Sequence, residues 1–120
     1  MNLEEIREYC INIKGASESF PFDEVTLVFK VMDKMFAVIG LEQKEEGFSV
    51  TLKCDPDKAL ELRETYEGII PAFHFNKRYW NSVRLEKDVS DKMIKELVNH
   101  SVEEVIKKLP KKKQEEYNNS

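Results

Sequence analysis

One short segment, Phe73 to Asn81, holds most of the side chains in this sequence that could bind a ligand. Its nine residues include four aromatic rings, two cations, two amides and a histidine. This mixture suits nucleic acid, because cations pair with phosphates, amides read base edges and rings stack on bases. With the nearby arginine of the following strand, the segment supplies the candidate binding residues: His74, Asn76, Lys77, Arg78, Trp80 and Arg84.

A structural role is the alternative for much of this segment. Phe73, Phe75 and Tyr79 could belong to the hydrophobic core while the charged residues solvate a turn. Trp80 differs, because the alternation of its strand places it on the outer side beside Arg84. An outward tryptophan is either covered by a loop or helix, or it is available to a partner.

Other kinds of chemistry find little support. Neither His74 nor His100 has a second histidine or a cysteine three or four residues away, and no Cys-x-x-Cys occurs. There is no Gly-x-Ser-x-Gly, and the four glycines are scattered, so we predict neither a serine nucleophile nor a phosphate-binding loop. Cys10 and Cys54 fit reduced thiols. We therefore expect a non-enzymatic protein with no metal and no cofactor.

Charge is unevenly divided along the chain. Residues 1–67 hold 8 lysines and arginines against 15 acids, a balance of −7, whereas residues 68–120 hold 11 against 8, a balance of +3. The net charge of −4 gives no general attraction to nucleic acid, so any binding must use a local patch. The lysines at 107–108 and 111–113 could add phosphate contacts, although a solvated helix end explains them equally well.

Hydrophobic spacing predicts the elements before this segment. Apolar residues three and four apart predict a helix from Asn2 to about Lys14, followed by a polar loop over 16–23. Alternation then predicts three strands in succession, over 25–31, 35–41 and 48–54. Asp55-Pro56 is an N-cap followed by proline, and it begins a second helix that Gly68 ends.

The segment itself lies between the last two predicted strands. An irregular strand over 69–75 contains Pro71, residues 76–78 turn the chain, and a fifth strand runs over 79–85. Ser90 can cap a helix, and Ser101 with Glu104 fits a capping box for another; one long helix across 99–101 is the alternative. Residues 111–120 have too few apolar side chains to pack, so we expect a flexible polar tail.

These elements follow the order α-β-β-β-α-β-β-α-α. That order predicts an α+β fold, a two-layer α/β sandwich with one antiparallel five-stranded sheet and its helices on one face. A chain of 120 residues suits one domain, which we place at residues 1–110. No apolar run approaches the roughly 18 residues of a membrane helix, and the N-terminus lacks secretory features, so we expect a cytoplasmic location away from membranes.

The central segment reads His74-Phe75-Asn76-Lys77-Arg78-Tyr79-Trp80. It resembles the H-[hydrophobic]-N-K-x-[aromatic/His]-W signature of the MmcQ/YjbR family of small bacterial proteins. Four other stretches agree with the family in the same order: Phe20–Asp23, Lys34–Ala37, Val50–Pro56 and Ser101–Pro110. The resemblance covers residues 1–113. Val102 departs from it, because an aromatic residue often follows this serine in the family.

The resemblance implies a two-layer fold like that of type III secretion chaperones and frataxin-like domains. The family is commonly described as DNA-binding, by structural similarity to the double-wing domain of a phage transcription factor. On that basis Lys77, Arg78 and Arg84 would touch the phosphates of double-stranded DNA, while His74, Asn76 and Trp80 would complete the surface. The alternative is a protein-interaction or chaperone-like module that binds a partner protein or a second copy of itself through Trp80 and its apolar neighbours.

Overall fold

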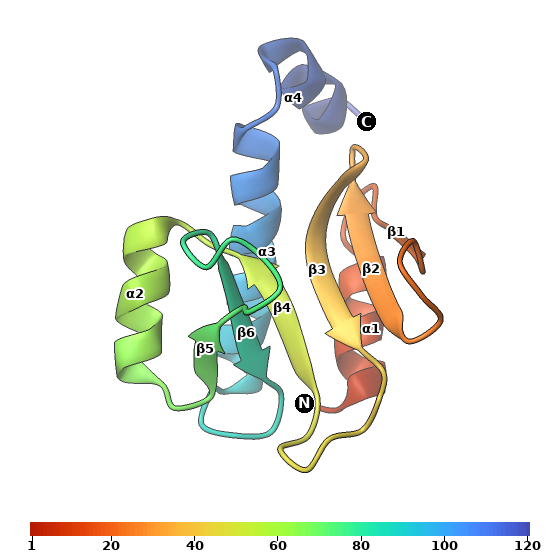
Figure 1. Ribbon diagram of the computed structural model, residues 1–120. Coiled ribbons are helices and arrows are strands. Elements are labelled where there is room, and N and C mark those ends of the chain that lie inside the picture. Colours follow the sequence, from red (N-terminus) through yellow and green to blue (C-terminus); the bar gives the residue numbers. More distant parts are fainter.

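The computed structural model describes residues 1–120, which form two layers. Six antiparallel strands make one sheet in the order β1-β2-β3-β4-β6-β5. Helices α1 and α3 pack on one face, α2 lies beside the β5 edge, and α4 lies beyond the end of α3 (Figure 1). In chain order the elements are α1 (Leu3–Ile11), β1 (Ser17–Ser19), β2 (Thr26–Val31), β3 (Lys34–Gly40), β4 (Ser49–Lys53), α2 (Pro56–Thr65), β5 (Ile69–Pro71), β6 (Trp80–Arg84), α3 (Asp91–Lys107) and α4 (Lys111–Asn118).

The α+β class is confirmed, but the sheet has six strands rather than the predicted five. The additional strand, β1, lies where the sequence predicts a loop, because its three polar residues give no apolar alternation. It is held by antiparallel pairing with β2, with Ser19 opposite Val28. An ion pair of 2.7 Å between Arg7 of α1 and Glu18 also fixes it. Pairing with a buried neighbour can impose a strand that the sequence pattern does not show.

The hydrophobic core fills the space between the sheet and its helices. Alternate residues of β2, β4 and β6 face the core, as strand geometry requires, whereas four consecutive residues of β3 are buried. Helix α1 begins with a capping box between Asn2 and Glu5 and contributes two fully buried side chains. The main core residues are Ile6, Cys10, Leu27, Phe29, Val31, Phe36, Ile39, Val50, Val83, Ile94 and Val98.

Ser101 lies inside one continuous helix, α3, and does not begin a second one. Its buried hydroxyl donates to the carbonyl oxygen of Phe36 at 2.6 Å and accepts from the backbone N–H of Lys53 at 2.9 Å. These two groups lie where β3 and β4 stop pairing. The hydroxyl therefore joins the diverging strands, since buried backbone groups need partners. The predicted capping box at Ser101 is wrong, and the alternative of a single long helix is correct.

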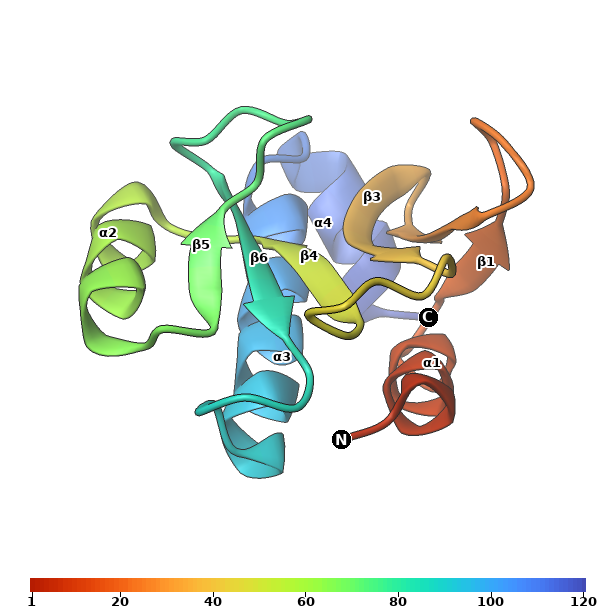
Figure 2. The same cartoon turned by 60° about the horizontal axis from the view of Figure 1, so that its bottom comes forward.

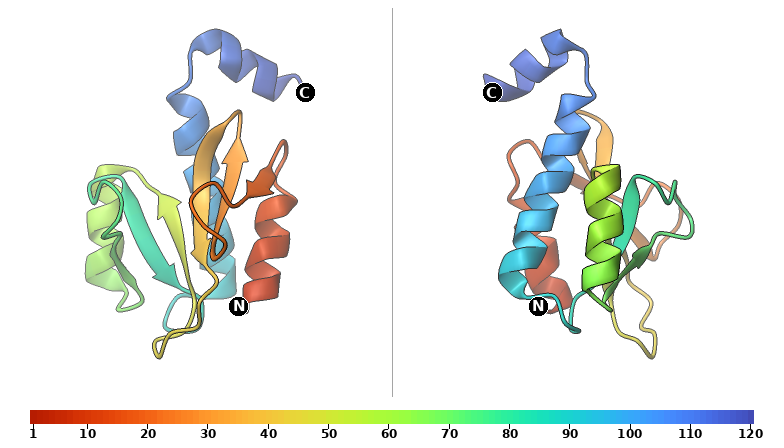
Figure 3. Two further views of the ribbon diagram at one scale, coloured as in Figure 1. Left: turned by 45° about the vertical axis from the view of Figure 1, so that its right-hand side comes forward. Right: turned by 90° about the vertical axis from the view of Figure 1, so that its left-hand side faces the viewer.

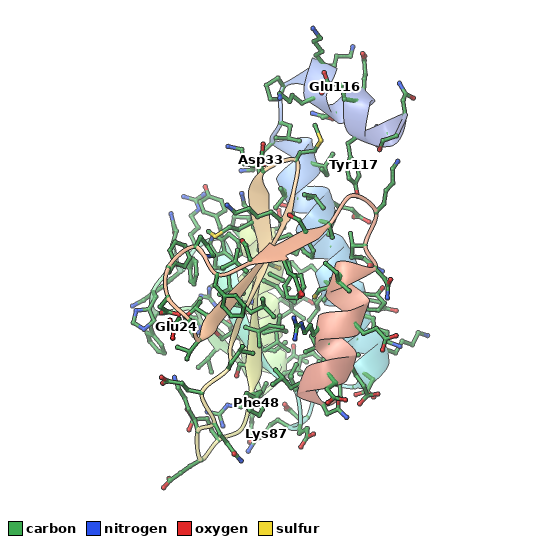
Figure 4. The ribbon with its side chains drawn as sticks, turned by 90° about the vertical axis from the view of Figure 1, so that its right-hand side faces the viewer. Glu24, Asp33, Phe48, Lys87, Glu116 and Tyr117 are labelled. Atoms are coloured by element: carbon green, nitrogen blue, oxygen red, sulfur yellow. The ribbon has the colours of Figure 1, made fainter.

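The C-terminal segment forms a helix, α4, where the sequence predicts a flexible tail. Tyr117 projects from α4 toward the loop between α1 and β1 (Figure 4). Its hydroxyl donates to the carbonyl oxygen of Lys14 at 2.8 Å, and the Lys14 ammonium lies 4.9 Å from its ring centre. The expectation that this segment does not pack is therefore wrong. With α4 included, no helix of the protein has the length and apolar character needed to cross a membrane.

The second face of the sheet is free of helices. The β1–β2 and β5–β6 loops rise on that side, away from α1 and α3 (Figure 2). The right-hand view of Figure 3 shows the β5–β6 loop projecting from this face while α3 covers the other. Glu24, in the β1–β2 loop, also lies on the side opposite to α1 (Figure 4). We call this helix-free side the open face.

Candidate functional site

The open face carries a cavity of about 770 Å³, which we call the open-face groove. Its floor is formed by short side chains of the central strands, including Val38, Thr51 and Ser82. Three loops form its walls: 20–25, 41–48 and 72–79. The first half of the predicted binding segment therefore becomes one wall of a concave site.

Hydroxyl groups occupy the centre of the groove floor. Thr51 of β4 and Ser82 of β6 are directly opposite each other in the antiparallel register. Their hydroxyl oxygens are 3.0 Å apart, so one hydroxyl donates to the other. The accepting hydroxyl keeps its own hydrogen free, which gives the floor one unused donor.

Exposed aromatic rings stand on two opposing walls. Phe22 of the β1–β2 loop is 63% exposed and Phe73 of the β5–β6 loop is 67% exposed. Both line the open-face groove, together with Phe48 and Phe75. Phenylalanine is usually buried, so exposed rings gathered around one cavity indicate a binding surface.

His74 and Arg84 are the two predicted site residues that line the groove. Arg84 is half-buried at the end of β6, where it lies opposite Ser49 of β4. The guanidinium groups of Arg7 and Arg63 are engaged by hydrogen bonds, whereas that of Arg84 has neither a hydrogen bond nor an ion pair. Arg84 therefore offers a free set of donors to a ligand in the groove.

Asn76 shapes the turn that presents the other candidate residues. Its side-chain oxygen accepts from the backbone N–H of Arg78 at 3.0 Å. Its backbone oxygen accepts from the N–H groups of Tyr79 and Trp80, each at 3.0 Å. An asparagine that bonds to its own backbone two residues on is a typical turn former. The side-chain amide nitrogen of Asn76 remains available.

Lys77 and Arg78 are adjacent in sequence but lie against different rings. The Lys77 ammonium is 5.1 Å from the ring centre of Phe73, which belongs to the groove wall. The Arg78 guanidinium is 5.6 Å from the ring centre of Tyr79. The turn at Asn76 therefore separates these two cations, which we expected from the sequence to act together on phosphates.

Trp80 is half-buried and packs against the ring of Phe75, with centroids 5.2 Å apart. It lies opposite Lys53 in the register of β4 and β6. Its position on the outer side of the strand follows the alternation, since its neighbour Asn81 is only 2% exposed. Phe75 covers part of the indole, so Trp80 is partly structural.

Arg63 of α2 is a positioning residue that the sequence does not reveal. Its Nε donates to the side-chain oxygen of Asn81 at 2.6 Å, and its Nη2 donates to the carbonyl oxygen of Lys77. The amide nitrogen of Asn81 donates to the carbonyl oxygen of Ala59 at 3.3 Å. Arg63 thus links helix α2 to the β5–β6 loop and to β6, through the backbone of Lys77 and the side chain of Asn81. The one available signal is Asn81, a polar residue at a buried strand position that needs partners.

A second surface gathers positive charge around Tyr79. The Lys108 ammonium lies 4.9 Å from the Tyr79 ring centre, so Tyr79 contacts both Lys108 and Arg78. Burial, together with the charges of Lys108 and Lys34, lowers the pKa of Lys53, although Glu104 opposes this shift. We call Lys34, Lys53, Arg78 and Lys108 the basic end.

Glu104 is the acidic residue that acts on this cluster, and it has its own partner. Its carboxylate bonds to the Lys107 ammonium at 3.0 Å and is only 9% exposed at the side chain. Hydrogen bonding to Glu104 raises the pKa of Lys107. The charge of Glu104 is therefore largely balanced by Lys107, which leaves the cations of the basic end in excess.

Cys10, Cys54 and His100 have structural roles. Burial raises the pKa of the Cys10 thiol to about 12 and that of Cys54 to about 11, so both stay protonated at neutral pH. The Nε2 of His100 accepts from the backbone N–H of Asp55 at 3.1 Å. No group of three or more His, Cys, Asp and Glu side chains gathers in a geometry that could hold a metal ion.

Comparison with known proteins identifies the family. The YjbR family model matches residues 11–103, which include the open-face groove and the whole binding segment. The chain belongs to the YjbR family. The resemblance found in the segment His74–Trp80 is thereby confirmed.

Two curated relatives extend over most of this YjbR chain. The uncharacterized protein YjbR of Escherichia coli K12 is 32% identical over 113 residues, which are 94% of each protein. The uncharacterized protein YbdF of Escherichia coli O157:H7 is 34% identical over 95 residues, or 79% of this chain and 76% of that protein. Both relatives are named as uncharacterized, so membership of the family does not by itself assign an activity to this protein.

Solved structures share the fold of this YjbR protein. The crystal structure of Deinococcus radiodurans protein DR2400, a DUF419 domain, matches with a TM-score of 0.88 and 33% identity, over 98% of this chain and 88% of that one. A solution NMR structure of a Pseudomonas syringae protein matches with a TM-score of 0.71 and 26% identity, over 86% and 91%. The sheet and its helices are therefore common to these proteins.

Proposed function

We propose that this YjbR protein binds double-stranded DNA non-enzymatically, through phosphate contacts at the basic end. The observation that carries the proposal is the convergence of four cations from four separate parts of the chain. Lys34 begins β3, Lys53 ends β4, Arg78 lies in the turn after Asn76 and Lys108 follows α3. Four cations near a single acid, Glu104, which is itself paired with Lys107, form a site for a polyanion.

Aromatic contacts support a binding role for this end. The side chains of Arg78 and Lys108 both pack against the ring of Tyr79. These contacts order the two long side chains in the absence of a ligand. Ordering in advance lowers the entropy lost on binding. Trp80 is opposite Lys53 in the sheet, so its indole reports on the same surface. Lysines 111–113, at the start of α4, extend the positive charge beyond Lys108.

The overall charge limits the strength of such binding. With a net charge of −4, the protein is repelled by DNA at long range and attracted only near the basic end. Phosphate contacts from about four cations would give a slope of about −3.6 in a plot of log K against log salt concentration. We also propose a cytoplasmic location, because DNA is accessible there. A reducing compartment also suits Cys10 and Cys54, which form no disulfide.

The test is a titration with a random 20-base-pair duplex, followed by the fluorescence of Trp80, the single tryptophan. Binding at low salt should weaken steeply toward physiological salt. Arg78→Ala and Lys108→Ala should each weaken it severalfold and reduce the salt slope by about 1. The matched control is Lys92→Ala, an exposed lysine at the opposite end of α3.

Two results would contradict this proposal. One is no binding at low salt, and the other is an equal effect of Lys92→Ala and Lys108→Ala. A protein partner would then be the better hypothesis, because Phe20 and Phe22 of the β1–β2 loop are 45% and 63% exposed. A molecular size that rises with concentration, is insensitive to salt and is reversed by Phe22→Ser would indicate self-association through that loop.

A further inference from the structure

The open-face groove differs in chemistry from the basic end and calls for a different ligand. We propose that it binds a small aromatic carboxylate, with the ring between the phenylalanines and the carboxylate on Arg84. Nothing in this assignment depends on the DNA proposal, because none of the four residues of the basic end lines the groove.

The size and lining of the groove suit a small molecule. Its volume of about 770 Å³ falls within the range of about 300–1,000 Å³ that is usual for small-ligand sites. Such sites combine apolar walls with a few polar groups that fix the orientation of the ligand. Here the walls carry phenylalanines and the floor carries hydroxyl groups and Arg84.

The rings of Phe22 and Phe73 define the part of the ligand that is aromatic. They belong to loops on opposite sides of the groove and expose 63% and 67% of their surface. The Lys77 ammonium lies 5.1 Å from the Phe73 ring centre, which holds that ring at the wall. A planar ring placed between them gains stacking or edge-to-face contacts in addition to burial of apolar surface.

Arg84 defines the part of the ligand that is anionic. Arg84 is half-buried and lines the groove, and its guanidinium has no hydrogen bond or ion pair, unlike those of Arg7 and Arg63. A planar guanidinium matches a carboxylate with two parallel hydrogen bonds. The hydroxyl pair of Thr51 and Ser82 adds one free donor on the adjacent strand positions.

The charges around the groove favour a ligand with a single negative charge. Both carboxylate oxygens of Asp23 are already bonded, to the backbone N–H of Val25 at 2.9 Å and the hydroxyl of Thr26 at 3.1 Å. Glu42, Lys44 and Glu46 line the groove from the exposed β3–β4 loop. The lining therefore carries three acids against two cations, Lys44 and Arg84, which disfavours a nucleotide or another polyanion, whereas a monocarboxylate needs only Arg84.

The experiment uses the full chain labelled with ¹⁵N and follows amide chemical shifts during titration with 2-naphthoate. Naphthalene-2-carboxamide has the same ring without the charge, and acetate has the charge without the ring. We expect 2-naphthoate to shift the amides of Thr51, Ser82 and Arg84, with both other probes at least tenfold weaker. Arg84→Gln should weaken 2-naphthoate by about 10- to 100-fold, as loss of a charged hydrogen-bonding pair implies. Lys92→Gln is the matched control and should change nothing.

Several outcomes would overturn the proposal. They are equal affinity for the naphthoate and its carboxamide, unchanged affinity in Arg84→Gln, or shifts that map away from the groove. A tetrapeptide with a C-terminal phenylalanine carries the same ring and carboxylate. Tighter binding of this peptide than of 2-naphthoate would overturn the assignment to a small molecule in favour of a protein terminus. Because the probes are compared on the unmodified chain, that comparison does not depend on the folding of Arg84→Gln.

Discussion

Asn76 and Asn81 lie five residues apart and show how residues of one type take different roles within a segment. Asn76 is exposed and uses its oxygens to build the turn. Asn81 is buried and bonds to Arg63 and to the backbone of Ala59. Strand alternation predicts that Asn81 faces inward, but its partner comes from α2, a separate element. The sequence alone therefore cannot identify Arg63 as the residue that holds the segment.

The substitution Arg63→Ala should destabilise the protein by about 1–3 kcal/mol, because it leaves the buried Asn81 oxygen without its donor. The measurement is the free energy of unfolding in urea. Glu64→Ala, an exposed neighbour in the same helix, is the control and should change stability by less than about 0.5 kcal/mol. Arg63→Lys should recover only part of the loss, since a lysine cannot reach both Asn81 and the Lys77 carbonyl with a planar fork. Equal stabilities of Arg63→Ala and Glu64→Ala would show that this contact is not a structural tie.

At the scale of elements, the strands with a buried face were predictable and the polar elements were not. Leu27, Phe29 and Val31 alternate toward the core, and so do Val50 and Leu52, because a half-buried strand has a period of two. β1 and α4 contain almost no apolar residues and are fixed by contacts with distant parts of the chain. A sequence pattern reports local burial, so it cannot report contacts such as those of Glu18 with Arg7 or Tyr117 with Lys14.

Helix α4 should depend on Tyr117 for its formation. It has 8 residues, and isolated helices shorter than about 12 residues are marginal in water. Tyr117→Ala removes both the hydrogen bond to the Lys14 carbonyl and the contact of the Lys14 ammonium with the ring. We expect the amides of 111–118 to lose protection from hydrogen exchange while the sheet keeps its protection. Glu116→Ala, at an exposed neighbouring position, should leave α4 intact. Unchanged protection in Tyr117→Ala would mean that another contact holds the helix.

At the scale of the whole molecule, the six candidate residues do not form one surface. His74 and Arg84 line the open-face groove, whereas Arg78 lies at the basic end with Lys108. These residues are close together along the chain, so the sequence analysis treats them as one surface. The turn at Asn76 directs Lys77 and Arg78 to different rings. Lys53 and Lys108 could not be assigned to the same surface from the sequence, because 55 positions separate them and only the fold brings them together.

The stability of the whole molecule should fall as the pH drops below about 6.5, through His100. Burial, and then the charge of Lys58, lowers the pKa of His100 in the folded protein below its ordinary value of 6.5. Its Nε2 accepts the backbone N–H of Asp55, so protonation removes an acceptor that links α3 to the start of α2. The unfolded chain therefore binds more protons in this range, and the contribution present above pH 6.5 is lost as the pH decreases. Urea unfolding of the wild type from pH 7 to pH 5 should show this decline, and His100→Gln should reduce it, because the glutamine oxygen accepts a hydrogen bond without titrating. Lys58→Gln should also reduce it by removing the second cause of the shift. Parallel pH profiles for the wild type and His100→Gln would assign the decline to other groups.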